Sequence, residues 1–140
     1  MSGPEVVNEA VRNPDAACPC GRGEPYGACC GTLHAGEPAP TAERLMRSRY
    51  AAFVLGLVDY LEHSWDDSTR PSDLEIDPDV AWRRLLIERV EAGNPFDREG
   101  YVTFTANGRT SEGRFEQRER SRFGRAADGR WVYIDGEEVF

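Results

Sequence analysis

The sequence lacks any apolar run that approaches the ~20 residues needed to cross a bilayer, so we do not expect it to span a membrane. No apolar stretch of signal-peptide length occurs near the amino terminus, which indicates the reducing cytoplasm as its compartment. Nucleic-acid binding is not favoured, because the net charge is −8 and duplex binding depends on Lys and Arg neutralising phosphates. Cysteine and histidine are scarce, with 4 and 2 copies in 140 residues.

What is present fits one globular domain with room for a small additional module. The chain has a mass of 15.7 kDa and is 39% hydrophobic and 30% charged. A domain of this length buries about two thirds of the surface that its unfolded chain exposes. We therefore expect a soluble protein with a single main core.

All four cysteines lie in one stretch, CPCGRGEPYGACC at residues 18–30. Two thiols from each short segment can surround one ion tetrahedrally, at metal–sulfur distances of about 2.3 Å, and the intervening glycines and proline let the chain turn back. Sulfur ligands favour zinc, with iron as the main competitor. Since protein sulfur would fill every position, we expect a structural rather than a catalytic metal.

Other interpretations of the cysteines are weaker. A vicinal disulfide and free thiols remain as alternatives to a metal site. A thioredoxin-type redox motif is not favoured, because Cys18-Pro-Cys20 has one residue too few. His34 lies just beyond the second pair and could replace one sulfur. Because four sulfurs already suffice, we expect His34 at the surface or beside the ligands.

The stretch CPCGRGEPYGACCG resembles the SEC-C motif, a small metal knuckle also found at the carboxyl end of the export ATPase SecA. In that motif CxC and CC supply the ligands, so the resemblance implies the metal ligands Cys18, Cys20, Cys29 and Cys30. Many SEC-C knuckles carry several lysines between the pairs, whereas Arg22 is the only cation here. The resemblance therefore does not imply a basic surface for docking to a ribosome or chaperone in this chain.

Two longer segments, residues 31–65 and 118–136, resemble the uncharacterised YchJ-like family. They read GTLHAGEPAPTAERLMRSRYAAFVLGLVDYLEHSW and RERSRFGRAADGRWVYIDG. In that family a SEC-C knuckle precedes a domain similar to nuclear transport factor 2, in which a curved sheet wraps around helices to form an open cone. The resemblance implies a zinc knuckle at 17–36 and a nuclear-transport-factor-2-like α+β domain at 41–140. Residues 1–16 have little periodicity, and we expect a flexible leader there.

Periodicity alone predicts helices followed by an antiparallel meander, which is an α+β fold class. Residues 41–56 form an amphipathic helix, with Leu45, Met46 and Tyr50 on its apolar face and Ser48 and Ala51 opposite. A short helix follows at 57–64. Alternation with period 2 then predicts strands at 101–107 and 113–123. Residues 80–92 are interpreted as a preceding strand, although their composition alone fits a helix almost as well, and residues 130–136 as the last strand. The Asn-Gly and Asp-Gly pairs of the connections ANGRTSEG and RAADGR are hairpin signals.

Two charged residues occupy apolar positions in this pattern. Arg49 falls within the helix stripe, and Glu119 shares a strand face with Phe115 and Phe123. Leaving either charge buried alone costs several kcal/mol, so we predict an Arg49–Glu119 salt bridge inside the cone. The surrounding side chains would be those of Tyr50, Ser121 and Trp131.

This pair could have a purely structural role, in which it fixes the helix against the sheet. Alternatively, it could line a pocket for a small polar ligand. His63, Asp59 and Asp135 are then candidate proton-transfer groups. The sequence places no base against such a pocket and assigns no catalytic residue.

The arginines of the third strand suggest a solvated outer face rather than a nucleic-acid surface. They alternate with acidic residues, and we expect ion pairs across the strands with Glu88 or Glu91. The arginines concerned are Arg114, Arg118, Arg120, Arg122 and Arg125. Domains of this kind often dimerise through the outer sheet face. Because that face is rich in arginine here, the sequence does not favour a dimer over a monomer.

Two functions are consistent with the sequence. In the first, the chain is a zinc-binding accessory or adaptor protein that binds a protein partner and performs no chemistry. In the second, the cone binds a small molecule, with isomerase- or dehydratase-like activity as an option, and the knuckle is a stabilising appendage. The four-cysteine cluster favours the first, because a closed metal site is the best-specified feature.

Overall fold

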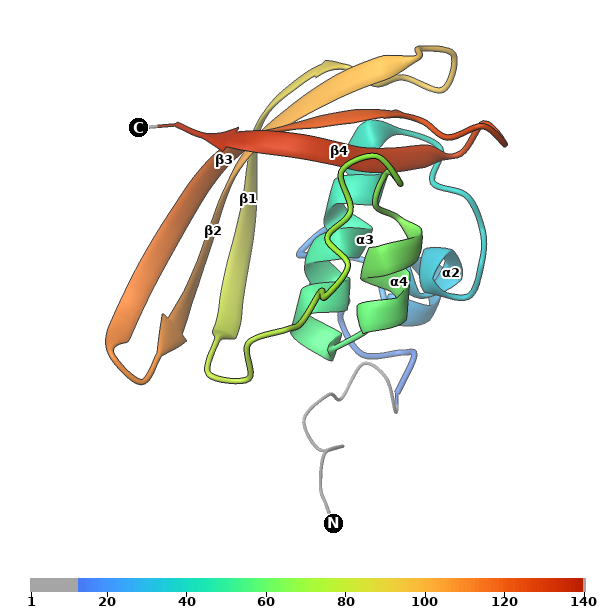
Figure 1. Ribbon diagram of the computed structural model, residues 1–140. Coiled ribbons are helices and arrows are strands. Elements are labelled where there is room, and N and C mark those ends of the chain that lie inside the picture. The colour runs from blue at the N-terminus through green and yellow to red at the C-terminus, as the bar shows by residue number, and fades with distance from the viewer. Residues whose placement is uncertain (1–12, 140) are drawn as a thin grey trace.

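The computed structural model describes residues 13–139, so the predicted leader at 1–16 lies mostly outside the described residues (Figure 1). Its helical part consists of η2 (Tyr26–Ala28), α2 (Cys30–His34), α3 (Ala42–Leu55) and α4 (Val58–His63). The strands are β1 (Ala81–Ala92), β2 (Glu99–Thr110), β3 (Gly113–Arg125) and β4 (Trp131–Glu138). Within residues 13–139, no helix is long and apolar enough to cross a membrane.

The four strands form one antiparallel sheet in the order β1-β2-β3-β4. Register shifts interrupt the pairing of β1 with β2 at two places, and that of β3 with β4 between Arg122 and Phe123. Such irregularities bend a strand and increase its twist. The sheet consequently curves around the helices, as Figure 1 shows, and this confirms the predicted α+β cone.

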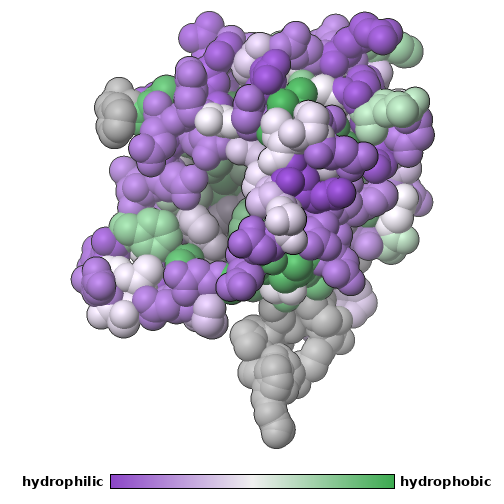
Figure 2. Space-filling model, in the orientation of Figure 1, coloured by the Kyte–Doolittle hydropathy of each residue, from purple (hydrophilic) through white to green (hydrophobic). Residues whose placement is uncertain are grey.

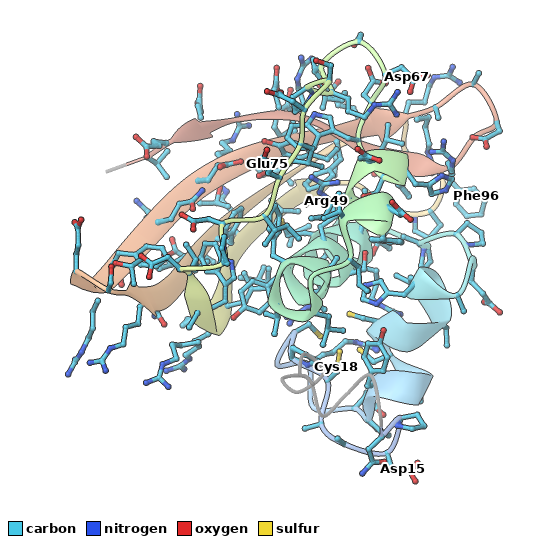
Figure 3. The ribbon with its side chains drawn as sticks, turned by 60° about the horizontal axis from the view of Figure 1, so that its bottom comes forward. Asp15, Cys18, Arg49, Asp67, Glu75 and Phe96 are labelled. Atoms are coloured by element: carbon cyan, nitrogen blue, oxygen red, sulfur yellow. The ribbon has the colours of Figure 1, made fainter. Side chains whose placement is uncertain are left out.

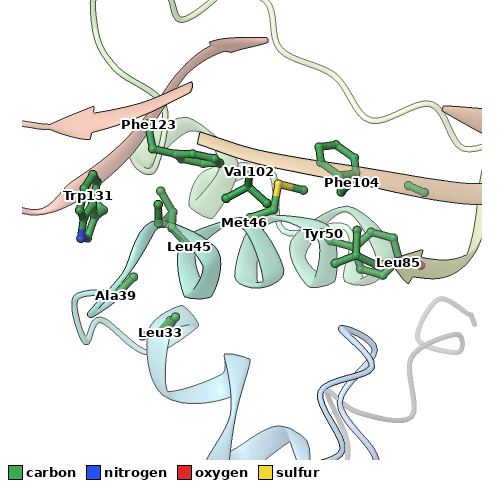
Figure 4. Close-up of a cluster of buried hydrophobic side chains, with 12 residues drawn as sticks. Leu33, Ala39, Leu45, Met46, Tyr50, Leu85, Val102, Phe104, Phe123 and Trp131 are labelled. Carbon is green, nitrogen blue, oxygen red and sulfur yellow. The ribbon is translucent and has the colours of Figure 1, made fainter. Parts of the chain in front are cut away.

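Helix α3 lies against the concave face of the sheet. Thr41 caps it by accepting a hydrogen bond from the backbone N–H of Arg44 at 3.1 Å, and Gly56 ends it in the left-handed conformation. Figure 4 shows its apolar side chains facing the strands. The core members contributed by this helix and the sheet include Leu45, Met46, Tyr50, Leu85, Val102, Phe104 and Phe123.

The opposite face of α3 is not solvated, contrary to the simple amphipathic prediction. Ser48 and Ala51, which were placed on the polar side, are both 0% exposed. The knuckle packs against Ala51, and α4 supplies Tyr60, whose hydroxyl lies 2.7 Å from that of Ser48. Helix α3 is therefore the central layer of the molecule, between the sheet and the cysteine segment.

All four predicted strands are confirmed, but one hairpin signal is wrong. The β3–β4 turn does contain the predicted Asp128-Gly129 pair. The β2–β3 turn instead falls at residues 111–112, and Asn107-Gly108 continues the ladder of β2. Gly108 is needed for close approach there, because a Cβ atom would lie 2.7 Å from the carbonyl oxygen of Ala81 and 3.1 Å from the Phe115 ring.

The outer sheet face carries the ion pairs expected from the sequence. Arg118 pairs with Glu88 at 2.8 Å, and Arg120 pairs with Glu91 at 3.0 Å. Arg125 departs from this pattern, since its guanidinium lies over the Trp131 ring and donates hydrogen bonds to backbone carbonyl oxygens. The two ion pairs link β3 to β1 across β2, and exposed pairs of this kind add little stability individually.

Candidate functional site

The knuckle brings its two cysteine pairs together through short backbone contacts. Ala17 pairs with Pro25 in an isolated antiparallel bridge, and the N–H of Cys18 donates to the carbonyl oxygen of Glu24 at 3.0 Å. The chain then passes through η2, so that Cys29 directly precedes α2 and Cys30 begins it. A turn and the start of a helix thus each present two thiols to one point.

The four thiols form a compact buried cluster. All four sulfur atoms lie within 4.8 Å of one another, and the Sγ atoms of Cys20 and Cys29 are 3.7 Å apart. That separation matches the ~3.8 Å edge of a tetrahedron with metal–sulfur bonds of about 2.3 Å, and it is far longer than a disulfide bond. Figure 3 shows the sulfur atoms gathered near Cys18. The cluster could therefore bind a metal ion.

Electrostatics within the cluster oppose full ionisation in the absence of a cation. Hydrogen bonds from the Cys20 and Cys30 thiols lower the pKa of Cys18 to about 3. The hydrogen bond with Cys18, together with that from Cys20 and burial, raises the pKa of Cys30 above its ordinary value. Arg22 is the nearby cation, with Nη1 3.7 Å from the sulfur of Cys29. A divalent ion would supply the charge that allows all four sulfurs to be thiolates.

Helix α3 supports the cluster from the other side. Ala51 belongs to the same buried group as the four cysteines. Arg47 donates from Nη1 to the carbonyl oxygen of Cys20 at 3.0 Å, while its Nε pairs with Glu43 at 3.0 Å. The cysteine segment and the cone thus share one packed interface.

His34 joins the knuckle to α3 and is not part of the sulfur cluster. Its Nε2 lies 2.9 Å from the carbonyl oxygen of Ser48, which can only accept, so Nε2 carries the proton. Its Nδ1 then accepts from the hydroxyl of Tyr26 at 2.6 Å. Burial lowers the pKa of His34, in agreement with a neutral ring. The expectation of a histidine beside the ligands, rather than among them, agrees with this placement.

The predicted Arg49–Glu119 salt bridge is wrong. Arg49 is 4% exposed, and its Nη1 donates to the carbonyl oxygen of Leu61 at 3.0 Å and to the hydroxyl of Ser64 at 2.6 Å. Its guanidinium also lies over the ring of Tyr133, 4.6 Å from the centroid. Aromatic faces and helix-end oxygens therefore replace the expected carboxylate. Burial lowers the pKa of Arg49 to about 10, which leaves it charged at neutral pH.

Glu119 is held by neutral donors instead. Its Oε2 accepts hydrogen bonds from Ser121 at 2.7 Å and from Tyr133 at 3.2 Å. Its Oε1 accepts from the side-chain amide of Gln117 at 3.2 Å. Gly136 leaves the space for this carboxylate, since a Cβ atom at that position would overlap it. Tyr133 thus contacts both Arg49 and Glu119.

Arg49 and Glu119 nevertheless line the same cavity, between α3 and the concave face of the sheet, with a volume of about 210 Å³. In the orientation of Figure 1, Figure 2 shows the surface hollowed where the strands bend away from α3. Tyr50 and Ser121 belong to this cavity, as predicted. Its further lining residues are Met46, Phe53, Trp82, Phe104, Ala106, Gln117 and Tyr133.

Two predicted pocket residues lie elsewhere. His63 is exposed, and together with Trp131 and Asp59 it lines a different cavity of about 330 Å³ beside α2 and α4. Asp135 lies on the outer sheet face, where it pairs with Arg122 at 3.1 Å. No proton-transfer group among the three candidates therefore reaches the cavity of Arg49. Strand alternation could have identified Tyr133, but the irregularity at Ile134, between Tyr133 and Asp135, hid the position of Gly136.

Comparison with known proteins agrees with this architecture. Residues 41–136 match the family described as "YchJ, middle NTF2-like domain", and residues 16–32 match the SEC-C motif. A UPF0225 protein of Streptomyces coelicolor is 50% identical over 125 residues, covering 89% of this chain and 97% of its own. A UPF0225 protein of Chromobacterium violaceum is 49% identical over 126 residues, covering 86% and 92%.

Two solved structures have the same fold. The solution structure of RPA3114, a SEC-C motif containing protein from Rhodopseudomonas palustris, has a TM-score of 0.76 and 32% identity, covering 88% of this chain and 98% of its own. The crystal structure of a SEC-C motif containing protein from Psychrobacter arcticus has a TM-score of 0.70 and 26% identity, covering 91% and 85%. With its cysteine knuckle packed on a curved-sheet domain, the chain belongs to the YchJ-like UPF0225 family.

Proposed function

We propose that the four cysteines bind one zinc ion, with iron as the competing metal, and that the chain is a cytoplasmic accessory or adaptor protein. The observation that carries the proposal is the arrangement of four buried sulfur atoms within 4.8 Å of one another. Four soft ligands with tetrahedral spacing suit zinc best and leave no position for a substrate. The metal would therefore be structural.

The chain's own residues would support the ion in two ways. Arg22 and Arg47 provide positive charge and a hydrogen bond close to the sulfurs, which carry a net negative charge when they hold a divalent ion. Ala51 closes the cluster against α3. Metal binding would fix the knuckle on the cone, so that both surfaces are presented to a protein partner in one orientation.

Elemental analysis of protein purified without added metal or chelator tests the metal. We expect one zinc per chain, and none in a Cys29→Ser/Cys30→Ser variant. His34→Gln is the matched control, because it alters the neighbouring histidine and leaves all four sulfurs, and it should retain the metal. A metal-free wild type with four titratable thiols would refute the proposal.

The adaptor role needs a second measurement. A protein partner recognised through the metal-fixed knuckle should bind the wild type and a His63→Gln control, which changes an exposed histidine outside the knuckle, but not the metal-free Cys29→Ser/Cys30→Ser variant. Equal binding of a partner to all three would assign recognition to the cone alone.

The cavity of Arg49 and Glu119 supports a second candidate function, the binding of a small molecule within the cone. It is mostly apolar, with a few polar groups that converge from α3, β3 and β4. Ligand sites commonly have this composition. At about 210 Å³ the cavity is smaller than typical sites for drug-sized molecules, so its ligand would be small.

A further inference from the structure

The cone cavity holds two charges that have no ionic partner. Within residues 13–139, neither Arg49 nor Glu119 has an oppositely charged atom within 4.0 Å, although both line the cavity. An uncompensated charge away from water is costly, and a direct salt bridge would be the usual solution. Tyr133 contacts both side chains, since its ring lies under the Arg49 guanidinium and its hydroxyl donates to Glu119. The two charges are therefore not paired with each other, and both line a space that a small molecule could enter.

Each charge also has unused hydrogen-bonding capacity. Only Nη1 of the Arg49 guanidinium has a hydrogen-bond partner among the described residues, so Nε and Nη2 remain as donors. On Glu119, Oε1 accepts only from Gln117, whereas Oε2 accepts from both Ser121 and Tyr133. A carboxylate oxygen can accept more than one hydrogen bond. The cavity thus offers donors on one side and an acceptor on the other.

The remaining walls are apolar and largely aromatic. Trp82 packs edge-on against both Tyr50 and Phe115, with ring centroids 6.1 Å and 5.3 Å apart, which fixes this side of the cavity. Phe53 and Phe104 complete it. Such walls favour the flat, apolar body of a ligand and make desolvation of a strongly charged head group expensive.

We propose that this cavity binds a small, mainly apolar molecule through a neutral head group that holds a hydrogen-bond acceptor beside a donor, as in a primary carboxamide. The acceptor would face Arg49 and the donor would face Glu119. A cationic head group would be attracted by Glu119 but repelled by Arg49. An anionic head group would be attracted by Arg49 but repelled by Glu119. A neutral dipolar head is favoured by both charges. This inference rests on the second proposed function, ligand binding in the cone.

Three probes with one body and different heads test the proposal: 3-phenylpropanamide, 3-phenylpropylamine and 3-phenylpropanoate. Binding is followed by NMR on the full chain loaded with its metal, using the indole N–H signals. The three tryptophans report on different places, because Trp82 lines this cavity, Trp65 contacts Arg49 and Trp131 lines the other cavity. We expect the amide to bind most tightly, to shift the Trp82 signal and to leave Trp131 unchanged.

Glu119→Gln provides the matched variant, since it removes one charge and preserves the size of the side chain. Arg49 then becomes the only charge at the cavity, and the preference should change from the amide to the carboxylate probe, by about tenfold in relative affinity. Gly136→Ala is the second variant. Its methyl group would displace the Glu119 carboxylate without removing it, and it should weaken amide binding even if Glu119→Gln folds poorly.

The outcomes separate the two levels of the argument. Failure of all three probes to shift Trp82 would overturn both ligand binding in the cone and the proposed head group. Equal binding of the three, or tightest binding of a charged probe, would overturn the head-group inference and leave cone binding in place. Tightest binding of the amide, lost in Gly136→Ala and redirected in Glu119→Gln, supports both.

Discussion

The imidazole Nε2 of His34 lies 2.9 Å from the carbonyl oxygen of Ser48, so a residue of the knuckle donates a hydrogen bond to the central helix of the cone. Tyr26 donates to the opposite ring nitrogen at 2.6 Å, and the Tyr60 ring packs edge-on against the imidazole. This arrangement requires a neutral ring. The knuckle and the cone of this chain are therefore joined by an interaction that depends on the protonation of one histidine.

Acid should weaken this joint. Burial lowers the pKa of His34 in the folded chain, so the unfolded chain binds more protons as the pH falls below the ordinary histidine value of about 6.5. Stability is then fully present above that value and declines as the pH falls toward the lowered pKa. We expect denaturant unfolding to show constant stability from this histidine above about pH 6.5 and a decline below it.

Replacement of each histidine checks the assignment. His34→Gln should flatten the pH dependence, whereas His63→Gln, which changes the exposed histidine, should leave it unchanged. Metal content measured at each pH separates this effect from protonation of the cysteines, which would release metal. The same pH dependence in both variants would contradict the assignment to His34.

Ala51 should be sensitive to added volume. It is 0% exposed and packs from α3 against the four cysteines. Ala51→Leu is expected to destabilise the fold by about 1–3 kcal/mol, because extra methylene groups in a packed core force neighbours to shift. Faster loss of metal to a chelator should accompany it. Ala127→Leu, in an exposed turn, is the control and should alter neither chemical denaturation nor metal release.

Arg49 should contribute strongly to stability although it has no carboxylate partner. Arg49→Met removes hydrogen bonds to Leu61 and Ser64 and the contacts with the rings of Trp65 and Tyr133. We expect a loss of about 2–4 kcal/mol in the free energy of unfolding, since hydrogen bonds from charged groups are the stronger ones. The exposed Arg84→Met serves as control in the same denaturation series. Equal effects of the two changes would contradict this role.

Gly108 should tolerate no side chain, because it lies within β2 and not in a turn. Gly108→Ala would press a methyl group against the Ala81 carbonyl oxygen and the Phe115 ring, and we expect a lower midpoint of thermal unfolding. The adjacent, half-buried Asn107→Ala should have a smaller effect. If Gly108→Ala were neutral and Asn107→Ala severe, the turn would have to be reassigned to the Asn-Gly pair.

Sequence alone determined the local features of this protein. The four cysteines lie within 13 residues of each other, so their spacing already restricted them to one cluster. Thr41 and Gly56 limit α3, and alternation predicted β2 and β3, because capping and side-chain direction depend on near neighbours. The resemblance to the family added the curvature of the sheet, which periodicity does not encode.

Only the tertiary structure decided which distant groups meet. Helical periodicity assigned Ser48 and Ala51 to solvent, because the pattern within one helix contains no information on the knuckle, which forms a second layer over that face. The prediction that Arg49 and Glu119 pair rested on their opposite charges. In the structure the guanidinium of Arg49 instead contacts Tyr133, Leu61 and Ser64. Partner choice is set by competition among all groups that the fold brings within reach, and that competition involves residues far apart in the chain.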